Sequence, residues 1–173
     1  FLNRFEGYIF EQPTGQVAIE HGGEWEFLPA GDTHALAHGG GLPVYQYVQH
    51  DAHFWGAELE TLWHLHESAA RTFDVKLAAD FTRAREDSGN LPRIPAARVT
   101  VGALWAAGPW AAGAESQFVF DQTRVATNES PSDGYTLVSA HLAYAWTTGR
   151  ATWQAFVRGS NLVNEEIRPH PSF

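Results

Sequence analysis

Histidine is the residue of this chain best suited to chemistry, and five of its nine histidines are concentrated between residues 21 and 53. Carboxylates lie among them, including Glu20, Glu24, Glu26 and Asp32. Imidazole together with carboxylate suits zinc and other borderline divalent metals. The sequence therefore indicates a candidate metal site, although a solvated His-rich loop would have the same composition. The candidate ligands are His21, His34, His38, His50 and His53.

The spacing of these histidines sets conditions on the structure around them. His34 and His38 are four residues apart, so they face the same way only if their segment is helical. His50 and His53 would lie on opposite faces of a regular strand, and a shared metal there would require a bulge. His64 and His66 form a His-x-His pair that could chelate. We interpret that pair instead as wall histidines facing a wet interior.

Other kinds of chemistry find little support in the sequence. The absence of cysteine excludes a disulfide framework and a Cys-based metal site. No glycine-rich phosphate loop and no nucleophile elbow is present, and no carboxylate pair stands out, so we expect neither an enzyme nor a resident cofactor. A net charge of −9 argues against nucleic acid as a partner. No apolar run approaches the ~20 residues that a membrane helix needs.

Strict alternation of apolar and polar residues dominates much of the chain. Within 73–82 the odd-numbered residues are apolar and the even-numbered ones mostly polar, as in a strand with one apolar and one polar face. Similar patterns predict an all-β, antiparallel up-and-down meander of about seven strands. We expect these strands at residues 3–12, 44–66, 72–85, 97–106, 110–125, 134–146 and 151–163.

The two faces have different chemistry. We expect an outward apolar face that includes Leu77, Phe81, Val99, Val101, Phe118, Leu142 and Val157. We expect a polar inner face that includes Asp74, Lys76, Asp80, Glu115, Gln117 and Arg158. Four tryptophans, Trp63, Trp105, Trp110 and Trp146, lie beside short turns, where an aromatic belt at a membrane interface would place them.

Connection lengths distinguish the two architectures that such strands allow. Short connections at 67–71, 107–109 and 147–150 alternate with long ones at 13–43, 86–96 and 126–133. All tight turns would then lie at one end of the sheet and all long loops at the other. Bacterial outer-membrane barrels have this asymmetry, whereas a soluble sandwich has no reason to sort its loops.

An odd strand count favours a portion of a larger barrel. Single-chain bacterial barrels close with an even number of strands, and an unclosed sheet would expose unpaired edges to lipid. Phe173 is an aromatic last residue, but Pro169 and Pro171 precede it, and proline cannot donate to a ladder. We interpret the last residues as loop rather than as a closing strand.

The later strands resemble the C-terminal end of TonB-dependent outer-membrane receptors. The matching elements are Tyr135-Thr136-Leu137, Tyr144-Ala145-Trp146, Thr148-Gly149-Arg150 and Asn161-Leu162-Val163-Asn164. The stretch from Leu42-Pro43-Val44 to Gly56-Ala57-Glu58-Leu59-Glu60 is similar to the long strand before the final hairpins, particularly in the zinc and haem receptor branch. Residues 168–173 are similar to the start of that branch's last extracellular loop.

The resemblance implies a transmembrane barrel of about 22 strands with an N-terminal plug, located in the outer membrane of a Gram-negative cell. Residues 1–173 would be a C-terminal barrel segment without the plug and without the closing strand. Its partners would be lipid, the rest of its own barrel and plug, and TonB through the missing N-terminal part. The function implied is uptake of a metal ion or metal complex, with zinc favoured over a siderophore or haem as the transported ligand.

Two other interpretations remain open from the sequence. The chain could be a soluble β-barrel module with a ligand cavity, which would fold in plain buffer without detergent. It could also be a small, complete outer-membrane barrel with a structural or adhesion role. The second alternative needs an eighth strand and a strand-compatible C-terminus, which Pro169 and Pro171 oppose.

Overall fold

A computed structural model of the chain describes residues 1–127 and 129–170, so Pro171 and Phe173 lie outside the described part. One antiparallel sheet contains every strand, in the order β2-β1-β3-β4-β6-β7-β8-β9, with β5 paired to β4. The elements are β1 (Leu2–His21), β2 (Glu24–Pro29), α1 (Thr33–Ala37), β3 (Leu42–Glu67), β4 (Arg71–Glu86), β5 (Gly89–Asn90), β6 (Arg98–Ala107), β7 (Trp110–Val119), β8 (Tyr135–Thr148) and β9 (Ala151–Gly159).

The predicted antiparallel meander is confirmed. Its seven long strands are β1, β3, β4, β6, β7, β8 and β9, and each pairs with the next long strand along the chain. Two short strands, β2 and β5, bring the sheet to nine. The only helix in the described part is α1, which falls within the 13–43 segment.

The expected loop at 13–43 is wrong, because most of that segment is regular structure. β1 continues to His21, β2 pairs back onto it, and α1 follows. The register of β1 against β3 shifts twice, between Phe5 and Tyr8 and between Pro13 and Val17. Gly7 and Gly15 lie at these shifts with φ of 66° and 76°. The first shift inserts one extra residue into β1 and moves the alternation onto the other face, whereas the second inserts two. The period-two pattern is therefore interrupted while the strand continues.

Two strands are shorter than expected, since β7 ends at Val119 rather than 125 and β9 at Gly159 rather than 163. After β7 the chain leaves the ladder, and Gln122, 2% exposed, donates from Nε2 to the carbonyl oxygens of Ile94 (2.8 Å) and Pro95 (3.2 Å). These residues therefore pack against the neighbouring loop. After β9, Asn161 adopts a φ of 51°, which ends the extended conformation.

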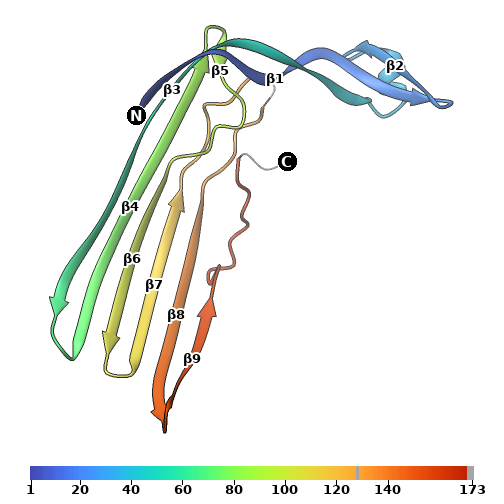
Figure 1. Cartoon of the computed structure of the whole chain (residues 1–173). Coiled ribbons are helices and arrows are strands. Elements are labelled where there is room, and N and C mark those ends of the chain that lie inside the picture. Colours follow the sequence, from blue (N-terminus) through green and yellow to red (C-terminus); the bar gives the residue numbers. More distant parts are fainter. Residues whose placement is uncertain (128, 171–173) are drawn as a thin grey trace.

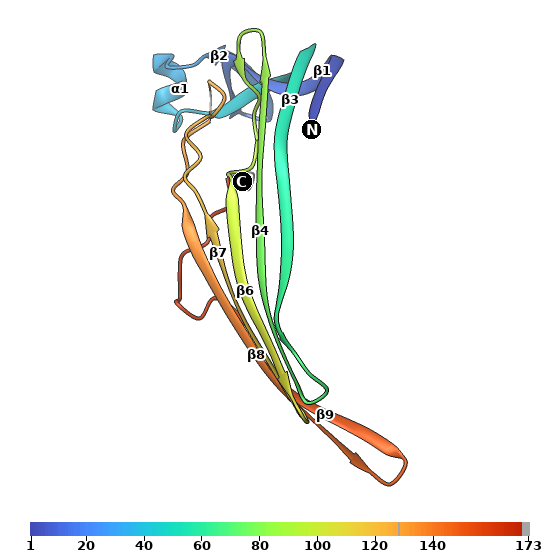
Figure 2. The ribbon, with the colours of Figure 1, turned by 90° about the vertical axis from the view of Figure 1, so that its left-hand side faces the viewer.

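The predicted sorting of the connections is present in the structure. The tight turns β3–β4, β6–β7 and β8–β9 lie together at one end of the sheet, and the long connections lie at the other (Figure 1). The outer parts of β1 and β3, together with β2 and α1, run across this long-loop end (Figures 1 and 2).

Strand register confirms the division into two faces. Directly paired residues of an antiparallel ladder lie on the same face. Leu77 pairs with Val101, and Leu142 pairs with Val157, all from the apolar set. From the polar set, Asp80 pairs with Arg98, and their side chains form an ion pair of 2.5 Å. The apolar face is open, with Val101 43% exposed, so nothing within the described part covers it.

Two small cores lie near the long-loop end. In the first, Ala35 of α1 packs on Val17 and Ile19 of β1. In the second, Leu91 of the β4–β6 connection packs against Ala52 and Ala84, with aromatic neighbours that include Tyr8, Phe10 and Phe54. Among the described residues, no helix has the length and apolar character that crossing a membrane requires.

Candidate metal centre

A tight hairpin positions the first histidine of the candidate site. β1 and β2 are joined by Gly22 and Gly23, whose φ values are 64° and 90°. Two-residue hairpin turns need positive φ, which glycine adopts without steric cost. His21 pairs with Glu24 across this turn, so His21 stands at the tip of the hairpin.

The short helix α1 positions two more histidines. Asp32 is its N-cap, and the Oδ1 atom accepts a hydrogen bond of 2.8 Å from the backbone N–H of His34. His38 is the C-cap, and the Gly39, Gly40 and Gly41 that follow all have positive φ. His34 and His38 are therefore one helical turn apart, so their segment is helical, as it must be for the two side chains to face the same way.

Packing fixes α1 against the hairpin. Ala35, 1% exposed, contacts Val17 and Ile19, and Leu28 of β2 packs against the same cluster. The chain returns through Gly41, where a Cβ atom would stand 2.9 Å from the carbonyl oxygen of Ala18. This close approach allows α1 to lie on the hairpin and brings its histidines towards His21.

The structure brings His21, His34 and His38 together, and we call these three residues the histidine triad. One ligand nitrogen from each lies within 4.8 Å of the others. The ring centroids of His34 and His38 are 4.8 Å apart, and those of His21 and His38 are 5.0 Å apart. All three side chains are exposed, so their rotamers can adjust to an ion.

Small movements would convert the histidine triad into a coordination sphere. With zinc–nitrogen bonds of about 2.0–2.1 Å, tetrahedral geometry separates the nitrogens by about 3.3 Å. The nitrogens therefore need to close by up to ~1.5 Å, within the range of side-chain rotation. Glu26 of β2 adds a carboxylate, with its Oε2 atom 3.7 Å from His34 Nε2. It can act as a fourth ligand or orient the imidazole of His34.

His50, a predicted ligand, lies outside the histidine triad and has other partners. The Nδ1 atom of His50 lies 3.3 Å from Oε2 of Glu86, whose side chain is only 7% exposed. The imidazole also packs edge-on against Phe10, with centroids 5.8 Å apart. Burial raises the pKa of Glu86, but hydrogen bonds from Ser88 and His50 outweigh burial and leave the pKa below its usual value.

His53 is also apart from the histidine triad. It lies three residues from His50 on an unbroken β3, so the two imidazoles lie on opposite faces. Its cross-strand neighbours are Arg4 on β1 and Arg85 on β4. Neither arginine offers a metal ligand, and Arg4 is already paired with Asp51 at 3.3 Å.

His64 and His66 do not share a face. A register shift between them leaves His64 opposite Asp74 and His66 opposite Phe73, and these two partners are on opposite faces of β4. His64 Nδ1 lies 2.8 Å from Asp74 Oδ1. The register therefore places His64 on the polar face with Asp74, whereas His66 lies with Phe73 on the apolar face, so the prediction that both histidines face a wet interior is wrong for His66.

The sequence did not single out Glu26 or Glu86 among many carboxylates. Glu26 meets His34 only because β2 folds back beside β1. The glycine pair 22–23 between two apolar-rich segments was the signal that could have predicted this hairpin. Nothing comparable marks Glu86, whose role depends on burial at the end of β4.

A family model for the β-barrel of TonB-dependent receptors matches residues 1–162. The chain belongs to the TonB-dependent receptor β-barrel family. This assignment agrees with the sheet topology, the sorted connections and the exposed apolar face.

Among solved structures, the chain is similar to one described as the copper transporter OprC, with a TM-score of 0.65 and 20% sequence identity. The match covers 98% of this chain and 24% of that one, so the chain spans about a quarter of that protein's length. At this identity the likeness supports the shared fold.

Proposed function

We propose that this chain is part of an outer-membrane receptor that takes up a metal ion or metal complex, and that the histidine triad captures the metal. The observation behind this proposal is the convergence of His21, His34 and His38 in a barrel of the TonB-dependent family. The histidine triad lies on the hairpin extension at the long-loop end, which is the extracellular end in outer-membrane barrels.

Ligand chemistry favours a borderline divalent ion such as Zn²⁺ or Cu²⁺. The candidate site offers imidazoles and a nearby carboxylate, and the chain contains neither cysteine nor methionine. Soft ions such as Cu(I) prefer sulfur ligands, whereas Zn²⁺ and Cu²⁺ accept imidazole. The structural neighbour described as a copper transporter adds support for a metal as cargo.

The rest of the proposed receptor follows from the family. The apolar face meets outer-membrane lipid, and the polar face, with ion pairs such as Arg98–Asp80, lines the interior around a plug domain. Transport would draw energy through TonB by way of parts that lie outside this chain. Neither catalysis nor a resident cofactor is part of the proposal.

Zinc titration of the full-length receptor in detergent tests the proposal. The variant replaces His21, His34 and His38 with alanine together. We expect zinc affinity to fall on the order of 100-fold or more, because only a carboxylate remains to bind the ion. The matched control replaces His53 and His66, two histidines outside the histidine triad, and should bind zinc as the wild type does.

Unchanged zinc affinity in the triad variant would remove this capture site. If the variant still imported a metal complex such as haem or a ferric siderophore, the receptor would have a substrate bound elsewhere. Binding should also weaken on acidification, because neutral imidazole is the form that coordinates metal.

A further inference from the structure

Three arginines gather at the long-loop end of the wall, and two of them lie on the face that is otherwise largely apolar. Arg83 and Arg85 of β4 follow Phe81 at intervals of two residues, so these side chains share one face. Strand register agrees, because Arg83 pairs with Trp55 of β3. Arg124, in the β7–β8 connection, lies within Coulombic range of Arg83. We call Arg83, Arg85 and Arg124 the arginine cluster.

The arginine cluster lies at the level where a bilayer would end. Trp55 and Trp63 of β3 both belong to the apolar face, and the stretch that they bound is about nine residues long, enough for a tilted strand to cross the hydrocarbon core. Aromatic girdles flank the apolar band of outer-membrane barrels, and the long loops of these barrels are extracellular. Arg83 is level with Trp55, and Arg85 lies two residues further towards the long loops. The two arginines of β4 therefore lie at the headgroups of the outer leaflet.

Aromatic rings hold the two arginines of β4 against the wall. The guanidinium carbon of Arg83 lies 5.8 Å from the ring centroid of Phe81, and that of Arg85 lies 5.8 Å from the ring of Trp55. Both distances are in the range of a cation–π contact. Arg83 also donates from Nη1 to the carbonyl oxygen of Thr82 at 3.1 Å. A guanidinium has five N–H donors, so each arginine keeps donors for a further partner while its ring contact limits where it can point.

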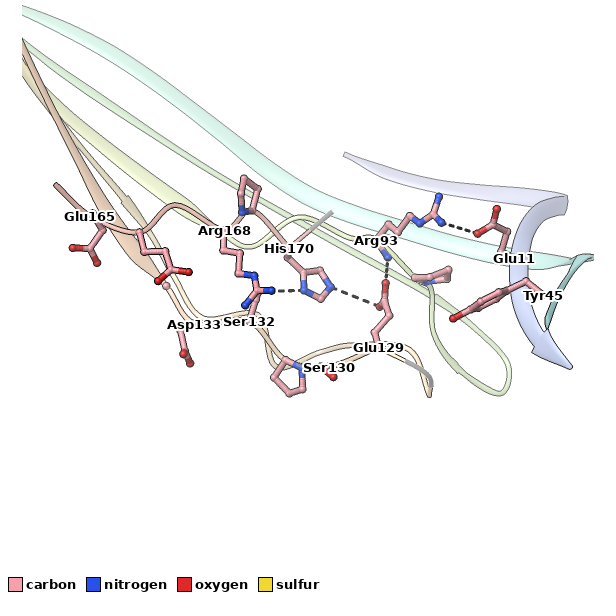
Figure 3. Close-up of a pocket in the computed structure, with 15 residues that line it drawn as sticks. Glu11, Tyr45, Arg93, Glu129, Ser130, Ser132, Asp133, Glu165, Arg168 and His170 are labelled. Carbon is pink, nitrogen blue, oxygen red and sulfur yellow. Dashed lines mark hydrogen bonds and ion pairs between the residues drawn. The ribbon is translucent and has the colours of Figure 1, made fainter. Parts of the chain in front are cut away.

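The charge of the arginine cluster is not neutralised by carboxylates. Within residues 1–127 and 129–170, none of its three members forms a salt bridge. Other arginines of the chain do have carboxylate partners, and the examples are Arg4 with Asp51, Arg93 with Glu11 (Figure 3) and Arg98 with Asp80. Acidic side chains outnumber basic ones in this chain, whose net charge is −9. An uncompensated positive cluster in such a chain favours an anionic ligand from outside it.

We propose that the arginine cluster binds the phosphorylated headgroup of an outer-leaflet lipid, whose acyl chains then lie along the apolar face. Guanidinium groups present paired N–H donors that match phosphate oxygens. Directly below the cluster the wall is open and apolar, with Phe81 38% and Val101 43% exposed. A soluble phosphate would leave this apolar surface uncovered, so the geometry favours a lipid. The proposal goes beyond metal uptake and does not depend on metal capture by the histidine triad.

Native mass spectrometry of the full-length receptor in detergent, titrated with diphosphoryl lipid A, tests the proposal. The test variant changes the whole arginine cluster, as Arg83→Gln, Arg85→Gln and Arg124→Gln. Each arginine beside an anionic headgroup contributes about fivefold, so the affinity for lipid A should fall on the order of 100-fold. The matched control makes the same change in net charge elsewhere, as Arg150→Gln, Arg158→Gln and Arg168→Gln, and should bind lipid A as the wild type does.

Further probes separate headgroup recognition from general contact with lipid. Monophosphoryl lipid A should bind the wild type more weakly than the diphosphoryl form, and dipalmitoylglycerol, which has no phosphate, should bind wild type and cluster variant equally. The variant without His21, His34 and His38 should keep its affinity for lipid A, so a failure of metal capture leaves this site standing. The proposal would be overturned if the cluster variant kept wild-type affinity for lipid A or if the control lost as much. Displacement of lipid A by inorganic phosphate at equal concentration would also overturn it, because the site would then be one for a soluble anion.

Discussion

The docking of α1 on the hairpin should control metal affinity, and Ala35→Glu is the change that tests this. Ala35 is 1% exposed and lies against Val17 and Ile19, with no cationic partner among its contacts. A carboxylate there would have to be buried without a partner, at a cost of several kcal/mol. A five-residue helix has little stability of its own, so we expect α1 to undock rather than accept the charge.

The size of the effect is the cost of burying the carboxylate less the contacts that docking makes. Burial is worth roughly 0.8 kcal/mol per methyl-sized group, and α1 docks through the Ala35 methyl and the parts of Val17 and Ile19 that it covers. That sums to about 2 kcal/mol. With a burial cost of about 4 kcal/mol for the carboxylate, restoring the docked state costs metal binding about 2 kcal/mol, so the apparent zinc affinity should fall by about 30-fold.

Leu36→Glu is the matched control, because Leu36 belongs to the same helix and is 61% exposed. It adds the same charge to the same helix without burying it. Zinc titration of both variants in the full-length receptor measures the affinities, and hydrogen exchange of residues 33–37 reports docking. Equal affinities for Ala35→Glu and Leu36→Glu would show that α1 docking does not organise the metal site.

Two further predictions concern the outer end of the sheet. Gly41→Ala should destabilise the docked α1 more than Gly39→Ala. Both residues have positive φ, but a Cβ at residue 41 would stand 2.9 Å from the Ala18 carbonyl oxygen, whereas a Cβ at residue 39 would meet nothing. Hydrogen exchange of α1 should be faster in Gly41→Ala, and equal exchange in the two variants would contradict the prediction. The lowered pKa of Glu86 means that its ionised form stabilises the fold above the ordinary glutamate range and that this contribution is lost as pH falls through the lower folded-state pKa. Protection of residues 87–97 against hydrogen exchange, corrected for the intrinsic pH dependence of amide exchange, should therefore decrease in acid in the wild type and lose this dependence in Glu86→Gln.

Much of the barrel wall could be predicted because its residues obey one rule. In β4, Phe73, Val75 and Leu77 alternate with Asp74 and Lys76, and the register places each set on its own face. One face meets an apolar environment and the other a polar one, so the alternation of apolar and polar residues follows directly from the two environments. Two of the three short turns could be predicted equally well, since Gly108 and Pro109 mark one and Gly149 marks the other.

The candidate metal site was only partly predictable. The spacing of His34 and His38 required a helix, and the structure provides it in α1. His21 joins them because α1 docks on Val17 and Ile19 of β1, a packing contact that the spacing of the histidines cannot reveal. The alternation rule already placed His50 and His53 on opposite faces, and burial of Glu86, invisible in the sequence, draws His50 away.

The glycines that interrupt the alternation along β1 also shape the candidate site. A strand that alternated without interruption from Leu2 to His21 would continue the straight wall of the sheet. Gly7 and Gly15 instead introduce bulges, which bend a strand and increase its twist. After the second bulge, Val17 and Ile19 present the apolar surface on which α1 docks. Broken periodicity near a cluster of histidines is therefore itself informative, because local rules are relaxed most often where a functional site needs a different geometry.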